Sequence, residues 1–382
     1  MIVGVLKETY PGERRVAIVP NNVPSLQKAG FAVHVESGAG LEAGYTDKMY
    51  EEESTVISDR SEVLTKANVI LQIRAIGTNP ESDPEDIKFL KKGKIVIGVI
   101  DALSNRSAVE TLASGNVKAF ALELVPRISR AQSMDVLSSQ ANIAGYKAAL
   151  LAADLLPRMF PMMMTAAGTI TPARVLVVGA GVAGLQAIAT CNRLGAIVSA
   201  YDIRPAVKEQ VKSLGAKFVE LELETEEAEA EGGYAKKMDE EFYSKQQQLM
   251  TRVVAESNVV ITTAAVPGKK APLLITEDMV SGMQTGSVIV DLAAETGGNC
   301  ELTEVGKTVV KHGVKIIGPE NLPSTVPYHA SQMYSKNISN LLMLMVDEGE
   351  IMINMEDEIL KESIVVDDGI VINDRVKESL GL

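Results

Sequence analysis

The amino-acid sequence predicts an α/β protein made of two Rossmann-like, doubly wound domains with parallel sheets, of which the first is discontinuous. Three observations lead to this prediction. Short apolar runs alternate with amphipathic segments in two separate series. A glycine fingerprint follows the first apolar run of the second series. The chain ends in a hairpin pattern that needs a sheet to pack on, and the first domain could accept it.

The first series predicts a parallel sheet covered by helices. Its strand candidates are Ile2–Leu6, Ala32–Glu36, Val69–Ile73, Ile95–Ile100 and Val117–Leu122. Amphipathic segments lie between them at Asn22–Ala29, Pro84–Lys91 and Arg106–Ser114, each shortly followed by a glycine that marks a helix end. This rhythm is typical of βαβ units. No glycine fingerprint follows any of these strands.

A long helical stretch, Ser129–Leu156, is expected to connect the two domains. The second series gives strand candidates at Arg174–Val178, Ile197–Tyr201, Lys217–Glu220, Val259–Thr262, Ser287–Leu292 and Val314–Ile317. A helical segment returns at Ala330–Val346, and the tail pairs Ile364–Val366 with Ile370–Ile372 across Asp368-Gly369. We therefore expect a first domain of residues 1–137 plus 328–382 and an inserted domain of residues 138–327.

Composition and charge narrow the function classes. The chain has 382 residues, a net charge of −13 and no run of Lys or Arg longer than two, so nucleic acid is not expected as a partner. Cys191 and Cys300 form no CxxC motif, and no signal-peptide pattern follows Met1, so we expect a reducing cytosol. Charged residues and prolines interrupt the most apolar long stretch, Ala148–Met164, so any membrane contact is expected to be peripheral.

The strongest single motif is the glycine fingerprint after Val175–Val178. Gly179 is expected to make the tight turn, Gly181 to let a pyrophosphate approach the backbone, and Gly184 to allow close packing of helix on strand. The phosphates would then meet the N–H groups at a helix N-terminus. Such a motif alone is weak, but here a strand precedes it and a helix follows it. We interpret it as a dinucleotide-binding turn.

Asp202, at the end of the next predicted strand, indicates NAD(H) in preference to NADP(H). A carboxylate at this place accepts hydrogen bonds from both ribose hydroxyls, but it repels a 2′-phosphate. Arg204 is close enough in sequence to soften that repulsion. The alternative interpretation is a solvated aspartate at the end of a strand.

The segment from Glu220 to Phe242 is strongly acidic, with seven glutamates before Gly232-Gly233. Charge at that density cannot be buried, so the segment is expected to project from the fold. The diglycine offers a hinge by which Tyr234 and Met238 could close over a bound nucleotide. A solvated acidic excursion without a role explains the composition equally well.

A polar cluster follows the last strand of the first series and contains Arg127, Gln132 and Asp135. These side chains would suit a pocket that orients a carboxamide. They would equally suit a capped helix start with Ser133 as the N-cap, and without further information this second interpretation is favoured.

The chain lacks a well-placed general acid or base. An ordinary dehydrogenase moves a proton as well as a hydride and often uses histidine for it. Of the three histidines, His34 lies in a predicted strand and His312 in a turn, which leaves His329 as the one plausible candidate. We therefore expect a nicotinamide binder without the machinery for alcohol or amine oxidation.

Several segments resemble a known family over essentially the whole chain. Lys7-Glu8, Pro11–Ala17 and Glu36–Gly40 resemble the opening that alanine dehydrogenases share with the alpha subunit of NAD(P) transhydrogenase. The matches to the transhydrogenase branch are Pro126–Asp135, Met164–Gly168, Gly232–Ala235 and Ala293–Cys300. The sequence is similar to the NAD(H)-binding component, domain I, of the proton-translocating enzyme in its split-subunit form.

The resemblance implies an oxidoreductase that is active only with partner subunits. Domain I of the Re/Si-specific enzyme docks onto an NADP(H)-binding domain carried by a membrane subunit, and hydride passes directly between the two nicotinamides. The membrane domain couples this transfer to proton translocation. The resemblance also implies a homodimer, cytoplasmic and peripheral at the cytoplasmic face of the inner membrane. Transfer between nicotinamides leaves no substrate proton to manage, which explains the missing acid–base pair.

The resemblance also assigns site residues. Gln132 would orient the nicotinamide, Arg127 and Asp135 would hold the loop and pocket, Ser138 would support them, and Tyr234 would sit on the mobile loop. The further cofactor contacts that it implies, in addition to the three glycines of the fingerprint, are Ser133, Met134, Val182, Asp202, Ile203, Arg204, Gly233, Ala264 and Ala265. No metal site is expected.

Two other functions remain as alternatives. A free-standing alanine dehydrogenase would have its catalytic histidine close to Asp101 and its catalytic aspartate at Glu295, and neither residue type is present there. A non-catalytic NAD sensor would carry the same binding motifs. Only the resemblance disfavours it.

Overall fold

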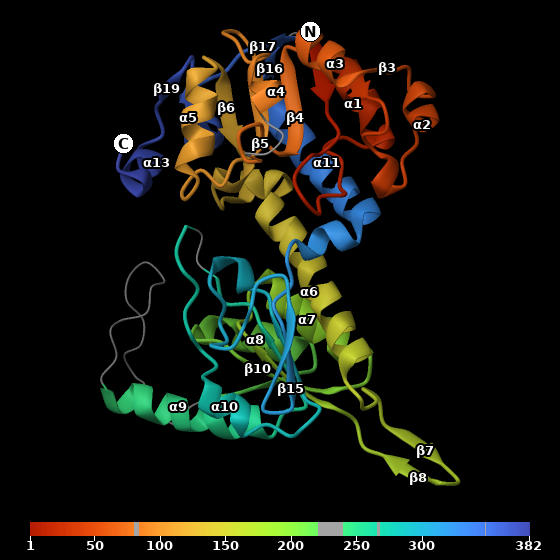
Figure 1. The fold of residues 1–382 in the computed structure, drawn as a ribbon, viewed down its shortest axis with the longest axis vertical. Coiled ribbons are helices and arrows are strands. Elements are labelled where there is room, and N and C mark those ends of the chain that lie inside the picture. The colour runs from red at the N-terminus through yellow and green to blue at the C-terminus, as the bar shows by residue number, and fades with distance from the viewer. Residues whose placement is uncertain (80–83, 221–239, 266–267, 348) are drawn as a thin grey trace. The chain divides into compact units, whose positions relative to one another are not determined.

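A computed structural model describes residues 1–79, 84–220, 240–265, 268–347 and 349–382. The chain divides into two compact units (Figure 1). The first unit contains Met1–Gln140 and Pro323–Leu382, and the second contains Ala141–Leu322. The first unit is therefore discontinuous. The boundaries expected from the sequence were at residues 137/138 and 327/328.

The first unit is built on an eight-stranded sheet with the order β19-β18-β6-β5-β4-β1-β2-β3. Its strands are β1 (Ile2–Val5), β2 (Ala32–Glu36), β3 (Val56–Ser58), β4 (Val69–Arg74), β5 (Ile95–Val99), β6 (Lys118–Ala121), β18 (Ile364–Asp367) and β19 (Ile370–Val371). The six strands β1 to β6 are parallel, and their order reverses between β1 and β4. That reversal makes the unit doubly wound. The sequence did not predict β3, a three-residue strand at the sheet edge.

Alternate residues along the strands of the first unit face two separate cores. Ile95 and Ile97 belong to one core, while Val96 between them belongs to the other. The helices are α1 (Val23–Lys28), α2 (Asp47–Glu51), α3 (Arg60–Lys66), α4 (Pro84–Ile87), α5 (Arg106–Ser114), α11 (Pro327–Leu344), α12 (Glu358–Ser363) and α13 (Asp374–Leu380). Helix α11 packs into the first core and α5 into the second. A short antiparallel pair, β16 (Val346–Asp347) and β17 (Glu350–Ile351), follows α11.

The tail hairpin completes the sheet of the first unit, as the sequence predicted. Strand β18 runs antiparallel to β6, with Ile364 opposite Phe120. The turn residues Asp368 and Gly369 have φ angles of 44° and 87°. Two successive positive φ values are typical of the type I′ turn that joins closely paired strands. The prediction that the tail lies on the first domain is confirmed.

The second unit contains a seven-stranded sheet with the order β11-β10-β9-β12-β13-β15-β14. Its strands are β9 (Arg174–Val178), β10 (Ile197–Tyr201), β11 (Lys217–Phe218), β12 (Val259–Thr262), β13 (Val288–Asp291), β14 (Thr308–Lys311) and β15 (Val314–Ile317). The helices are α6 (Val136–Leu155), which begins in the first unit, α7 (Val182–Arg193), α8 (Lys208–Ser213), α9 (Glu240–Ala255) and α10 (Glu277–Ser281). All pairs are parallel except β14 with β15. The strand order reverses between β9 and β12, so this unit is also doubly wound.

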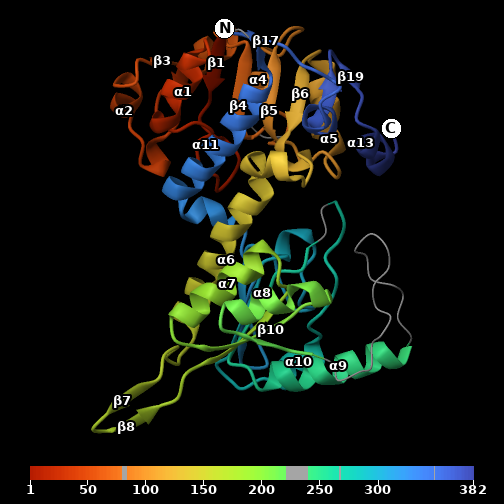
Figure 2. The same ribbon diagram turned by 180° about the vertical axis from the view of Figure 1, so that it is seen from behind.

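Two features of the second unit were not predicted. Strand β14 forms an antiparallel edge on the otherwise parallel sheet. A second hairpin, β7 (Met163–Thr165) with β8 (Gly168–Ile170), has all of its strand residues exposed and extends away from the strands and helices of its unit (Figures 1 and 2). Within the described residues, none of the helices combines the length and the apolar character needed to cross a bilayer.

Candidate functional site

The glycine turn between β9 and α7 has the geometry that its spacing predicts. Gly179 has a φ of 98°, and a Cβ built on it would lie 2.6 Å from Thr263 Oγ1. A Cβ on Gly184 would lie 1.9 Å from the carbonyl oxygen of Gly179, so the helix can pack here only without a side chain. A Cβ on Gly181, in contrast, meets no atom within 4 Å. Two glycines therefore serve the fold, and the third keeps space open over the helix N-terminus.

Helix α7 offers free donors in that open space. Gly181 is its N-cap residue, and no side chain accepts a hydrogen bond at this cap. The first N–H groups of a helix have no partner inside the helix, and the aligned peptide dipoles give that end a partial positive charge. The backbone N–H groups of Val182 and Ala183 are thus placed to bind an anion, and a phosphate fits that chemistry.

Asp202 lies directly after β10, on the strand next to the glycine turn. Its Oδ2 accepts a hydrogen bond from the backbone N–H of Ala180 at 2.7 Å. Its Oδ1 accepts from the backbone N–H of Arg204 at 2.8 Å and from Arg204 Nε at 3.0 Å, and Arg204 Nη2 lies 3.0 Å from Oδ2. Burial raises the pKa of Asp202, but Arg204 and these N–H groups outweigh it and hold the pKa below its usual range. The carboxylate is therefore ionised and bonded to the glycine turn.

The loop after β12 is fixed by residues that the sequence analysis gave no role. Asn299 clamps Ala264 from both sides: its Oδ1 accepts from the Ala264 N–H at 2.9 Å, and its Nδ2 donates to the Ala264 carbonyl at 2.8 Å. Asp291, fully buried at the end of β13, accepts in turn from the backbone N–H of Asn299 at 2.8 Å. Thr263 Oγ1 donates to the carbonyl of Gly179 at 3.0 Å, which ties the same loop to the glycine turn.

No local signal could have identified this clamp. Asn299 lies within the segment Ala293–Cys300, which carried the family resemblance without a role for any residue. The clamp joins positions that are distant along the chain, and both Asn299 and Asp291 are fully buried. Their partners become visible only when β12 and β13 lie side by side. Ala265, which follows Ala264, is exposed.

In the first unit, the polar cluster lies on a 3-10 helix, Ser129–Met134, before α6 begins. Asn337 and Asn340 of α11 donate to the carbonyl of Ser133 at 2.8 and 3.0 Å. Arg130 forms a bidentate ion pair with Asp357, with N–O distances of 2.7 and 3.0 Å. These contacts fix the backbone of the 3-10 helix from two sides.

The candidate residues on this 3-10 helix differ in exposure. The side chains of Arg127, Gln132 and Ser133 are exposed, whereas Met134 is buried in the core. Within the described part of the chain, the side chains of Arg127 and Gln132 make no hydrogen bond or ion pair, and neither is held to a structural partner there. Both are therefore available for a ligand.

Asp135, and not Ser133, caps helix α6. Asp135 Oδ1 accepts from the backbone N–H of Ser138 at 2.8 Å, and its Oδ2 accepts from the Ser138 hydroxyl at 2.6 Å. An acceptor that lies three residues before its backbone donor is the geometry of an N-cap. The sequence-based assignment of Ser133 was wrong because α6 begins two residues later than expected, after the 3-10 helix. Asp135 and Ser138 do lie together, as a hydrogen-bonded pair.

Some candidate residues cannot be compared with the structure. Gly233, Tyr234 and Met238, with the proposed mobile loop, lie outside the described residues. Val182, Asp202, Ile203, Arg204, Ala264 and Ala265 lie in the second unit with the glycine turn, whereas the cluster around Gln132 lies in the first.

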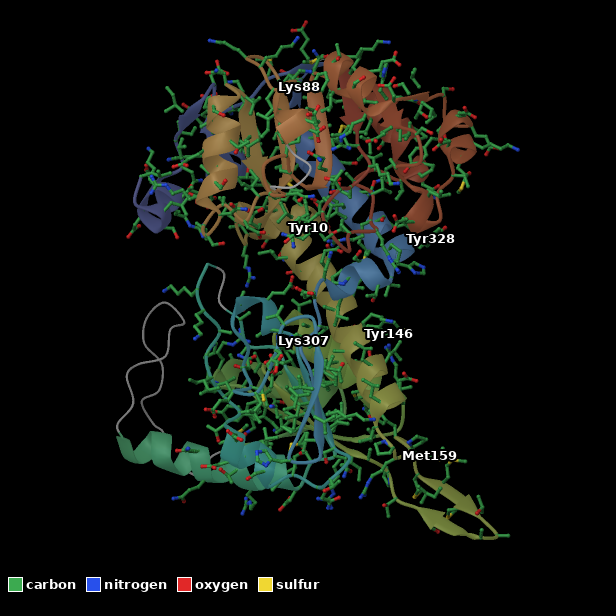
Figure 3. The ribbon with its side chains drawn as sticks, viewed as in Figure 1. Tyr10, Lys88, Tyr146, Met159, Lys307 and Tyr328 are labelled. Atoms are coloured by element: carbon green, nitrogen blue, oxygen red, sulfur yellow. The ribbon has the colours of Figure 1, made fainter. Side chains whose placement is uncertain are left out.

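The three histidines have surroundings that do not indicate acid–base catalysis. His34 lies in β2, and burial lowers its pKa. His312 Nε2 lies 2.8 Å from Glu277 Oε1 on the surface. His329, at the start of α11, packs edge-on against Tyr328 with 5.2 Å between ring centroids (Figure 3). Over the ranges that the structure covers, no group of three or more potential ligands is placed to hold a metal.

The structure does contain acidic groups that the sequence analysis missed. Glu8, after β1, is buried and accepts hydrogen bonds from the backbone N–H groups of Ile73 at 2.6 Å and Arg74 at 3.1 Å. Burial, with Glu13 nearby, raises the pKa of Glu8 to about 8. These bonds join the carboxyl ends of β1 and β4, where the strand order reverses. Glu8 thus links the two halves of the first sheet.

Comparison with known proteins gives a consistent picture over the whole chain. Residues 4–144 match the family model described as alanine dehydrogenase/PNT, N-terminal domain, and residues 148–374 match its C-terminal domain. The first of the separate chains that make up NAD(P) transhydrogenase subunit alpha in Rhodospirillum rubrum is 48% identical over 377 residues, which cover 98% of each chain. The crystal structure of transhydrogenase from Sinorhizobium meliloti is 44% identical, with a TM-score of 0.87, and covers 97% of this chain and 100% of its own. An L-alanine dehydrogenase structure shares the fold, with a TM-score of 0.84 at 23% identity over 100% of this chain and 99% of its own.

Proposed function

Because the chain belongs to the alanine dehydrogenase/PNT family and, within it, to the NAD(P) transhydrogenase alpha subunits, we propose that it is the NAD(H)-binding component of a proton-translocating transhydrogenase. One observation carries the cofactor part of this proposal. An uncapped helix N-terminus behind Gly181 and an ionised carboxylate at Asp202 are joined by a hydrogen bond through Ala180. These are the two groups that a pyrophosphate and an adenosine ribose need.

The residues divide into two sets around the cofactor. Gly179, Gly181 and Gly184 with the first N–H groups of α7 would hold the pyrophosphate, and Asp202 would hold the ribose. Val182, Ile203, Arg204, Gly233, Ala264 and Ala265 would complete the adenosine side, and Tyr234 would close over the bound nucleotide. When bound, NAD(H) supplies or accepts the hydride at its nicotinamide ring.

The nicotinamide end is assigned to the first unit. Gln132 would orient the carboxamide, with Ser133, Met134 and Asp135 beside it and Arg127 supporting the pocket. The exposed, unpaired side chain of Gln132 on a backbone fixed by α11 supports this role. The Ser138–Asp135 pair supports the loop by capping α6.

Direct transfer between nicotinamides requires placement of the two rings and no acid–base group. The surroundings of the three histidines support such a reaction. Against an alanine dehydrogenase reaction, Asp101 stands where the family resemblance would place a histidine, and its Oδ2 is paired with Arg74 Nη1 at 2.6 Å. Glu295 replaces the aspartate of that reaction. A non-catalytic NAD sensor is the remaining alternative, and family membership favours the oxidoreductase.

The proposal includes partner chains. The Rhodospirillum rubrum relative is named as one portion of an alpha subunit, which supports the existence of other subunits. We assign to them an NADP(H)-binding domain, which accepts the hydride, and a membrane domain, which couples the transfer to proton translocation. The chain itself would be a homodimer, cytoplasmic and peripheral at the cytoplasmic face of the inner membrane.

The test is a comparison of three reactions with one protein preparation. Purified protein with NADH should show no turnover with pyruvate and ammonia, and it should exchange hydride when an NADP(H)-loaded partner domain is added. NADH oxidation that depends on pyruvate and ammonia would establish the alanine dehydrogenase alternative. Tight NADH binding without either reaction would establish the sensor.

A further inference from the structure

The carboxylate of Asp202 has no free acceptor position in this structure. A carboxylate offers about four lone-pair sites. Two of them are taken by backbone donors, the N–H groups of Ala180 and Arg204, which belong to the loops themselves. The other two are taken by the guanidinium of Arg204, through Nε at 3.0 Å and Nη2 at 3.0 Å. The side chain of Asp202 is 6% exposed and that of Arg204 is 53% exposed.

An adenosine ribose brings two hydroxyl donors, which equals the number of positions that the Arg204 side chain occupies. We propose that Arg204 competes with the ribose for Asp202, so that NAD(H) binds only when the guanidinium leaves the carboxylate. This inference rests on the proposed NAD(H) site and adds a specificity-determining role for Arg204. The two backbone donors stay in place during the exchange, because they are fixed by the glycine turn and by the loop itself.

The exchange has a consequence for the choice between NAD(H) and NADP(H). Once displaced, the guanidinium remains on its stem beside the ribose, where a 2′-phosphate would lie. Arginine pairs with phosphate through two parallel hydrogen bonds. Arg204 therefore weakens NAD(H) binding by competition and strengthens NADP(H) binding by attraction. Both effects narrow the discrimination that Asp202 alone would give.

This role predicts the opposite sign from a simple contact role. If Arg204 only contacted the adenosine, its removal would weaken NADH binding. If it competes for Asp202, its removal strengthens NADH binding and weakens NADPH binding. A partly exposed ion pair contributes about 1 kcal/mol at most, which corresponds to about a fivefold change in Kd.

The variants are Arg204→Met, which keeps the apolar stem and removes the fork, and Arg204→Lys, which keeps the charge without the fork. Arg174→Met is the matched control. It makes the same change in charge in the same unit, at the first residue of β9, where Arg174 lies 3.8 Å from Glu256 on the surface. Calorimetry gives Kd for NADH and NADPH with each protein.

We expect Arg204→Met to bind NADH about fivefold more tightly and NADPH several-fold more weakly, with Arg174→Met unchanged. Arg204→Lys should gain NADH affinity while keeping most of its NADPH affinity. The gain should shrink at high salt, because the competing ion pair is screened in the wild type. Without any nucleotide, a carboxyl ¹³C titration should show that the pKa of Asp202 is higher in Arg204→Met than in the wild type.

The outcomes separate this inference from the proposed function. If the wild type binds NADH and Arg204→Met binds it equally or more weakly, the competition is refuted and the cofactor site stands. If the wild type binds no NADH, the cofactor site fails and the competition fails with it. An unchanged pKa of Asp202 in Arg204→Met would show that the guanidinium does not occupy the carboxylate in solution.

Discussion

Replacing single glycines of the β9–α7 turn by alanine should separate ligand binding from stability. In Gly181→Ala the new methyl meets no protein atom within 4 Å, and the backbone at φ −77° and ψ −168° is extended, which alanine adopts readily. Stability should stay constant or rise by up to about 1 kcal/mol, because alanine restricts the unfolded chain. The methyl nevertheless fills the space over the N–H groups of Val182 and Ala183.

The loss of affinity in Gly181→Ala follows from two distances. A phosphate oxygen bonded to these N–H groups would lie about 2.9 Å from the nitrogens. Ordinary contact with a Cβ begins at 3.4 Å, so the pyrophosphate must move away from the helix. Loss of one charge-assisted hydrogen bond costs about 1.5–3 kcal/mol, which corresponds to a tenfold to hundredfold weaker Kd for NADH.

Gly184→Ala should show the reverse pattern. Its Cβ would lie 1.9 Å from the carbonyl oxygen of Gly179, so the helix and the turn must separate by about 1.5 Å to reach ordinary contact. Overpacking of this kind costs about 1–3 kcal/mol and should lower Tm by several degrees in a unit of this size. The assays are calorimetry with NADH and thermal unfolding of the protein without nucleotide. Normal NADH binding by Gly181→Ala, or an equal loss of Tm in both variants, would refute this assignment of the glycines.

Three further predictions concern other residues. Asp202→Ser should weaken NADH binding about tenfold or more and narrow the gap to NADPH, whereas equal affinities of the wild type for both nucleotides would remove the assignment. Gln132→Asn should slow single-turnover hydride transfer to a partner domain by about a hundredfold with a near-normal Kd for NADH, because an amide displaced by about 1 Å misplaces the ring; an unchanged rate would leave Gln132 without a role. Glu8 holds a proton in the folded protein between its ordinary pKa of 4.5 and about 8, so this residue stabilises the fold at low pH and its contribution falls as the pH rises through that window. Unfolding by urea at about pH 5, 7 and 9 should therefore show the stability of the wild type falling relative to Glu8→Gln, and a constant difference would contradict the assignment.

The parts of the fold that could be predicted from sequence are those with a strong local pattern. Strands β9, β10, β12 and β15 have the bounds that their apolar runs indicate, because parallel strands buried on both faces consist almost entirely of apolar residues. Strand β14 was missed since it lies at the sheet edge, exposes most of its residues and mixes Thr and Lys with valine. An edge strand needs no apolar face, so its sequence resembles a loop.

The candidate site divides in a similar way. The glycine turn and Asp202 have a fixed spacing within one βαβ unit, so their geometry follows from local rules. The start of α6 did not, because a 3-10 helix and an α-helix have similar local preferences, and only the contacts from α11 show where one ends. Asn299 and the Asp202–Arg204 competition depend on hydrogen-bond partners, and these exist only after the strands have paired.

The tail hairpin bears on the order in which the chain can fold during synthesis. The second unit is continuous, so it can form as soon as residues up to Leu322 have left the ribosome. The first unit must wait, because Tyr334 and Leu341 of α11 belong to its core and β18 covers the edge of β6. Until then β6 presents an unpaired edge and an apolar face, which are the features that attract other chains. A nascent first unit is therefore the stage at which this protein most needs protection by a chaperone, and truncation before Ile364 should make that exposure permanent.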